Sequence, residues 1–76
     1  MKELVEYIAK NLVDDPDSVK VQETQEEQGF VSVTLEVNPQ DKGKVIGRQG
    51  RVAKSMRTLL RVMAVKDDVR VNLEIL

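Results

Sequence analysis

Hydrophobic side chains recur along this chain with two different periods, and the changes of period mark its helices and strands. Between residues 2 and 13 the spacing is that of an amphipathic helix, whose hydrophobic stripe consists of Leu4, Val5, Ile8, Ala9 and Leu12. Pro16 ends this helix, because proline disfavours helical geometry in the residue before it. From Val19 the period is two, since Val19 and Val21 alternate with polar residues in the manner of a half-buried strand.

A second strand with a stronger pattern follows a predicted turn at residues 26–29. Gly29 in that turn takes a positive φ at little cost. Beyond the turn, hydrophobic residues alternate with polar ones until Asn38-Pro39 ends the strand, and they are Val31, Val33, Leu35 and Val37. Two strands joined by a turn that contains glycine predict a β-hairpin.

Two helices are predicted after the hairpin. The first is short, over residues 42–46, and Asp41 is expected to cap it. Gly47 and Gly50 interrupt the helical pattern, and the second helix runs from residue 51 to about residue 65. Its hydrophobic stripe consists of Val52, Met56, Leu59, Leu60 and Met63, with Ala53 and Ala64 beside it.

The last strand completes a recognisable order of elements. After a turn at Asp67-Asp68, hydrophobic residues alternate with polar ones at Val69, Val71, Leu73 and Ile75. Two helices between the second and third strands are long enough for a crossover, so these strands should be parallel. The order α-β-β-α-α-β predicts a single α+β domain over residues 1–76, with a three-stranded mixed sheet covered on one face by three helices.

Composition removes several classes of site. The 76 residues include no cysteine and no histidine, which excludes disulfides, thiolate or imidazole zinc sites, and Ser-His or Cys-His catalytic couples. Asp14, Asp15 and Asp17 lie around Pro16 without the spacing of a calcium loop, so we interpret them as a turn rather than as metal ligands. We therefore expect no metal and no cofactor.

The chain also lacks the usual signs of a membrane or secreted protein. No apolar run approaches the roughly 20 residues that span a bilayer. Lys2 and Glu3 stand where a signal peptide would become apolar. We expect a soluble intracellular protein that has no membrane partner.

Charge is distributed unevenly along the chain. Residues 1–37 carry three lysines against nine acids, a net charge of −6, whereas residues 38–76 carry nine basic residues against four acids, a net charge of +5. Between residues 42 and 61 there is no acid, and the cations of this basic block are Lys42, Lys44, Arg48, Arg51, Lys54, Arg57 and Arg61. The block indicates either an anionic partner or a solvated helix face that pairs with the acidic half.

The centre of the basic block is a loop with the pattern Gly-x-x-Gly, at residues 47–50. Glycine tolerates the backbone angles of a tight turn and has no Cβ to keep a ligand away. The loop leads into a helix N-terminus, where unpaired N–H groups and the helix dipole favour phosphate. A bare Gly-x-x-Gly match also fits a helix-turn-helix corner without a ligand, so the context of the loop decides between the two interpretations.

In this order of elements, the run Val45-Ile46-Gly47-Arg48-Gln49-Gly50 resembles the core motif of KH domains, the RNA-binding modules whose GXXG loop holds about four nucleotides. The helix and strand before the loop resemble the type II, prokaryotic arrangement. Residues 41–54 resemble the small stand-alone bacterial KH proteins of the KhpA (YlqC) type. The resemblance covers nearly the whole chain.

The resemblance implies a non-catalytic protein that clamps short single-stranded RNA at the loop. The expected RNA-binding residues are Lys44, Ile46, Gly47, Arg48, Gln49, Gly50, Arg51, Lys54 and Arg57. The cations would face phosphates, while Ile46 and the apolar edge of the sheet would meet bases. Tyr7 and Phe30 are the only aromatic residues, which disfavours RNA-binding folds that stack bases on aromatic side chains.

The resemblance further implies a cytoplasmic RNA chaperone or post-transcriptional regulator that self-associates and pairs with a larger KH-containing RNA-binding protein. An alternative from another class is a protein-interaction adaptor that dimerises or docks on such a partner. We expect a homodimer or heteromer, with the contact near Leu59–Met63, although the same residues fit a buried core. No acid–base or nucleophile pair favours an enzyme.

Overall fold

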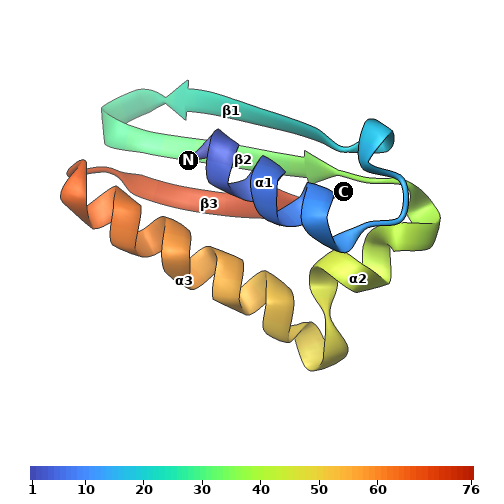
Figure 1. The fold of residues 1–76 in the computed structure, drawn as a ribbon. Helices are drawn as coiled ribbons and strands as arrows, with labels where there is room; N and C mark the ends of the chain where they lie inside the picture. Colours follow the sequence, from blue (N-terminus) through green and yellow to red (C-terminus); the bar gives the residue numbers. More distant parts are fainter.

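The computed structural model describes all of residues 1–76 (Figure 1). Each predicted helix and strand is present in the predicted order. The helices are α1 (Lys2–Leu12), α2 (Lys42–Ile46) and α3 (Arg51–Lys66), and the strands are β1 (Lys20–Glu26), β2 (Phe30–Glu36) and β3 (Arg70–Ile75). None of the helices has the combination of length and apolarity that crossing a membrane requires.

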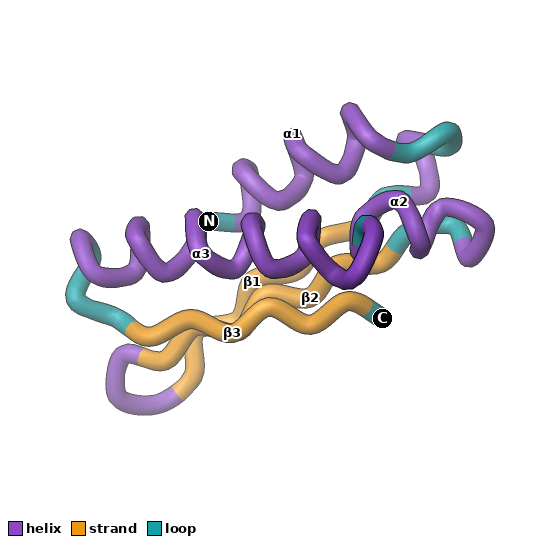
Figure 2. The backbone as a smooth tube through the Cα atoms, turned by 90° about the horizontal axis from the view of Figure 1, so that it is seen from below, coloured by secondary structure: helices purple, strands orange, loops and turns teal.

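The three strands form one mixed sheet in the order β1-β2-β3. β1 and β2 are antiparallel, with Val21 opposite Leu35, and β2 and β3 are parallel, with Val33 opposite Leu73. Figure 2 shows the three helices on one face of this sheet. The α+β fold with a three-stranded mixed sheet and three helices, as in a type II KH domain, is thereby confirmed.

The tight turn of the hairpin uses two left-handed residues. Gly29 has a φ of 73°, as its position in the predicted turn requires, and Gln28 before it has a φ of 56°. A positive φ is uncommon for a residue with a side chain. Together they reverse the chain between Glu26 and Phe30, which pair with each other at the end of the ladder.

The hydrophobic core lies between the helices and the sheet. Side chains that alternate along the strands point toward the helices, because successive residues of a strand face opposite sides of the sheet. β2 contributes Val31, Val33 and Leu35, all buried, as a central strand should. From the other elements the core takes Val5, Ala9, Val21, Val45, Met56, Leu60 and Leu73.

The buried faces of two helices differ from the predicted stripes. Leu12 and Leu59 are 39% and 47% exposed, so both predictions of burial are wrong. Ala53 and Ala64, expected only beside the stripe of α3, are buried in its contact with the rest of the protein. The buried residues of α3 follow each other at spacings of three and four, and Leu59 lies about 100° around the helix from the buried Leu60, outside that face.

Asp41 does not cap α2 with its side chain, contrary to the prediction. It occupies the position before the helix, but its carboxylate makes no capping hydrogen bond. Instead the side chain is buried, 3% exposed, and its Oδ2 accepts a hydrogen bond of 3.1 Å from the backbone N–H of Asp15. Asp41 thus joins the connection after α1 to the start of α2.

Candidate nucleic-acid interface

The Gly-x-x-Gly loop forms a single 3₁₀ turn, Arg48–Gly50, between α2 and α3. The N–H of Gly47 donates to the carbonyl of Gly43 at 2.8 Å and ends α2, while the N–H of Gly50 donates to the carbonyl of Gly47 at 3.1 Å. Gln49 has a φ of 58° and Gly50 a φ of 74°. These two consecutive residues with a left-handed backbone turn the chain sharply just before α3.

The two glycines of the loop serve different purposes. A Cβ on Gly47 would lie 2.8 Å from the backbone N of Val52 and would also meet the Val52 side chain. Gly47, with φ 79° and ψ 170°, moreover occupies a region of backbone angles that is essentially restricted to glycine. A Cβ on Gly50 would meet nothing within 4 Å. Gly47 is therefore needed for packing, and Gly50 leaves open space beside the loop.

A groove of about 390 Å³ begins at this loop and runs between α3 and β3. Its apolar lining comes from Ile46, Ala53, Leu73 and Ile75, and its polar lining from Arg57, Asn72 and Glu74, with Gly50 at the loop. An apolar groove with a cation beside it suits the flat faces of bases next to a charged backbone. Of the predicted residues, Ile46, Gly50 and Arg57 line this groove.

Most cations of the predicted site are free to meet an anion. Arg48, Arg51 and Lys54 are exposed and take part in none of the ion pairs of the protein. The guanidinium of Arg51 donates to Oε1 of Gln49 at 3.3 Å, which links the loop to the first turn of α3. The interpretation of the basic block as a helix face paired with acids therefore does not hold for these residues.

Lys44 differs from the other cations because it already has two acidic partners. Its ammonium donates a hydrogen bond to Asp14, and it lies 3.7 Å from Oδ1 of Asp41. The hydrogen bond to Asp14, followed by the attraction of both carboxylates, holds the pKa of Lys44 above its ordinary value. The structure thus gives Lys44 a role in tying α2 to the end of α1, and less freedom to meet phosphate than sequence alone indicates.

One family of known proteins matches nearly the whole chain. The family model described as "KhpA/KhpB, KH domain" matches residues 2–75 of the chain. The chain belongs to this KH family. The KH match spans α1 to β3, so the groove and the loop both lie inside it.

Curated relatives of this KH domain are similar over their whole lengths. The protein named "RNA-binding protein KhpA" of Clostridium acetobutylicum is 53% identical over 76 residues, which are 100% of both chains. That of Clostridium perfringens is 50% identical over the same span, and that of Aquifex aeolicus is 47% identical over 100% of this chain and 95% of its own. These relatives are named as RNA-binding proteins and not as enzymes, in agreement with the expectation of a non-catalytic protein.

Part of the KH groove was not named from the sequence. Ala53, Asn72, Leu73, Glu74 and Ile75 line it beside the predicted residues. The sequence did indicate that an apolar sheet edge would lie beside Ile46. Which residues of β3 form that edge depends on the parallel register of β2 and β3, and only the folded chain supplies it.

Proposed function

We propose that this chain is a non-catalytic RNA-binding protein that clamps about four nucleotides of single-stranded RNA in the groove beside the Gly-x-x-Gly loop. The observation that carries the proposal is the combination of this groove with exposed cations that have no acidic partner. The relatives named as RNA-binding proteins support it.

The clamp would act through backbone and charge together. Phosphates would approach the loop at Gly50, where no side chain blocks them and the dipole of α3 favours an anion. The N–H of Arg51, the first residue of α3, already donates to the carbonyl of Arg48, so it is not one of the donors left for phosphate. Arg48, Arg51 and Lys54 would add full charges around the same point. Bases would lie on the apolar lining of the groove, of which Ile46 is the part nearest the loop in sequence.

The direct test replaces both loop residues between the glycines. Arg48→Asp with Gln49→Asp should abolish RNA binding, because two carboxylates would face phosphate and one cation would be lost. Both residues are exposed, and aspartate tolerates the left-handed backbone of position 49, so the change in stability should stay within about 0.5 kcal/mol.

The matched control carries the same change of charge elsewhere. Lys20→Asp with Gln22→Asp alters two exposed residues of β1, on the sheet face that carries no helix and at the edge away from β3. This variant should bind RNA nearly as the parent does. A loop variant that melts like the parent and still binds RNA would show that the loop is not the clamp.

A second candidate function rests on an apolar surface outside the groove. Leu59, Val62 and Val65 of α3 are 47%, 53% and 79% exposed, and we refer to them as the outer α3 face. Exposed apolar groups that follow each other along one helix fit a protein contact. Such a surface supports an adaptor that dimerises or docks on a larger KH-containing RNA-binding protein.

The two functions are compatible. A site for about four nucleotides is small, and joining two such sites raises the effective concentration of the second. We therefore infer that residues 1–76 act as one KH domain within a homodimer or a heteromer. In the cell this chain would serve as an RNA chaperone or post-transcriptional regulator in the cytoplasm.

A further inference from the structure

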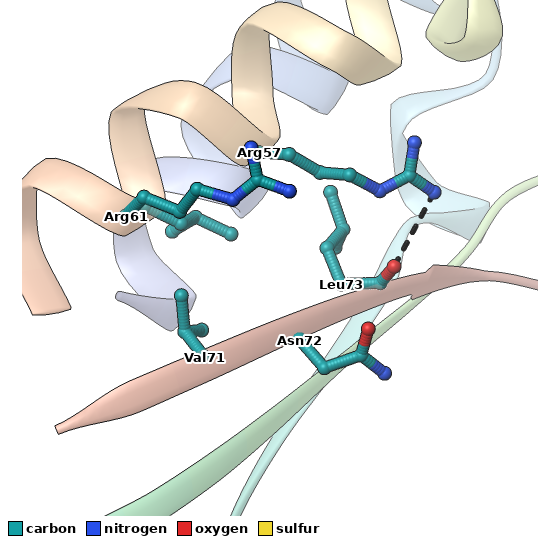
Figure 3. A pocket seen from close by; sticks show the side chains of 6 residues that line it. Arg57, Arg61, Val71, Asn72 and Leu73 are labelled. Atoms are coloured by element: carbon teal, nitrogen blue, oxygen red, sulfur yellow. Dashed lines mark hydrogen bonds between the residues drawn. The ribbon is translucent and has the colours of Figure 1, made fainter.

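Beyond Arg57, the space between α3 and β3 continues into a small pocket of about 30 Å³. Its lining residues are Arg57, Leu60, Arg61, Val71, Asn72 and Leu73, and we refer to it as the side pocket (Figure 3). Arg57, Asn72 and Leu73 also line the groove. The side pocket is therefore an extension of the groove away from the Gly-x-x-Gly loop.

Two arginines from successive turns of α3 reach toward this pocket. Figure 3 shows the side chains of Arg57 and Arg61 extending from the helix over β3. Four residues along a helix correspond to roughly 6 Å, so the two cations follow the groove in single file. The spacing suits neighbouring phosphates of one strand.

Neither arginine is paired with a carboxylate, although Glu74 lines the groove together with Arg57. No acidic residue lines the side pocket. The guanidinium of Arg57 makes one hydrogen bond, of 3.4 Å, to the carbonyl of Leu73. A guanidinium has five N–H donors, so both side chains keep donors for an oxyanion.

Protection of the sheet edge explains the position of only one of the two arginines. β3 is an edge strand, and a cation on its outward carbonyls discourages pairing with another chain. Arg57 fills that role at Leu73. Arg61 makes no hydrogen bond with β3 or with any other element, and its charge has no structural partner.

We propose that Arg57 and Arg61 form a second phosphate-binding subsite, which holds the backbone of the nucleotides next to those in the groove. The bound RNA would then follow α3 from the loop to the side pocket and occupy more than four nucleotides. This inference rests on the proposed function, because the same strand must pass through both places.

The test compares RNA lengths on matched variants. Arg61→Gln should bind an eight-nucleotide single strand about fivefold more weakly than the parent does at 0.1 M salt. One phosphate contact adds about 0.7 to log K for each tenfold fall in salt concentration, and 0.1 M is one tenfold step below 1 M. Its affinity for a four-nucleotide strand should not change. Arg57→Gln should weaken both, since Arg57 lines both the groove and the side pocket.

Lys66→Gln provides the control, because Lys66 is an exposed cation of the same helix that lines neither the groove nor the side pocket. It should leave both affinities as they are. Light scattering should give Arg61→Gln the mass of the parent, so that a change in assembly does not imitate the effect.

Neutral methylphosphonates placed one at a time in the eight-nucleotide strand locate the contact. One substitution outside the groove nucleotides should weaken binding to the parent but not to Arg61→Gln. If Arg61→Gln weakens both lengths equally, or neither, the subsite is overturned. If the variant with Arg48→Asp and Gln49→Asp still binds four nucleotides, the proposed function itself fails, which is a separate result.

Discussion

At the scale of single residues, the same amino acid has different tasks in one motif. Gly47 is fixed by the backbone of Val52, which leaves no room for a Cβ, whereas Gly50 borders open space. A sequence motif records both positions only as glycine. The contacts show that a side chain at position 47 would clash with Val52, whereas a side chain at position 50 would meet open space.

The first prediction separates these tasks. Gly47→Ala should lower the free energy of unfolding by about 2–4 kcal/mol, because a clash with Val52 adds to a backbone conformation that alanine disfavours. Gly50→Ala should cost only about 1 kcal/mol, for the left-handed backbone alone. Urea unfolding of both variants measures the difference. Equal losses would contradict the assignment of packing to Gly47.

The second prediction concerns Asp15, in the connection after α1. Hydrogen bonds from Ser18 at 2.6 Å and from Asn38 at 3.2 Å lower the pKa of its carboxyl below the ordinary 3.8. A lowered folded-state pKa stabilises the fold above the ordinary value, and this stabilisation is lost as the pH falls through the folded-state value.

Ser18→Ala removes the larger of these effects, so the pKa of Asp15 should rise toward 3.8 in a carboxyl titration followed by NMR. The variant should be less stable than the parent at pH 7, and the gap should narrow at pH 3. Ser55→Ala is the control, because Ser55 is an exposed residue of α3 with no side-chain hydrogen bond. If the difference in stability between Ser18→Ala and the parent does not change with pH, the lowered pKa of Asp15 is not its cause.

At the scale of elements, the hydrophobic pattern was sufficient for order and type but not for orientation. β2 and β3 alternate strictly, and both were found as predicted. On α3 the pattern selected Leu59, while the structure buries Ala53 and Ala64. Both Leu59 and Leu60 are hydrophobic, and only the rotation of the helix about its axis, which the folded protein fixes, decides that Leu60 is buried and Leu59 is exposed.

Ion pairs between elements could not be predicted from the sequence either. Lys44 and Asp14 are 30 positions apart, and nothing in their local sequence predicts that they meet. The prediction from the sequence therefore included Lys44 among the cations of the RNA site. Its pairing also explains why a list of basic residues overstates the charge that is available to a phosphate.

The third prediction compares Lys44 with Lys54, an exposed cation without an acidic partner. Lys54→Gln should make the slope of log K against log salt shallower by about 0.7 and leave stability within about 0.5 kcal/mol. Lys44→Gln should change the slope less and lower stability, since Asp14 and the buried Asp41 lose a partner. Salt titrations measure the two slopes, and thermal melts measure the two stabilities. Equal slope changes would indicate that Lys44 contacts RNA as much as Lys54 does.

At the scale of the whole molecule, ion pairs hardly connect the acidic and the basic half of the chain. Only the pair of Lys44 and Asp14 joins the acidic residues 1–37 to the basic residues 38–76. The outer α3 face, which is apolar, belongs to the same helix as Ala53 and Arg57 of the groove. One helix therefore carries both the proposed RNA contacts and the proposed contact between subunits.

The fourth prediction tests this combination. If two copies meet through the outer α3 face, Leu59→Gln with Val62→Gln should convert a dimer into a monomer in light scattering, without adding charge that would repel RNA. Affinity for a twenty-nucleotide strand should then fall toward that for an eight-nucleotide strand, the length proposed for one domain with its side pocket, by up to the 10²–10⁴-fold that linkage supplies. Tyr7→Gln, which alters a residue that is 70% exposed on α1, should change neither mass nor affinity. A parent protein that is monomeric and binds both lengths equally well would refute the dimer. If the double variant remains dimeric, the dimer contact lies on another surface.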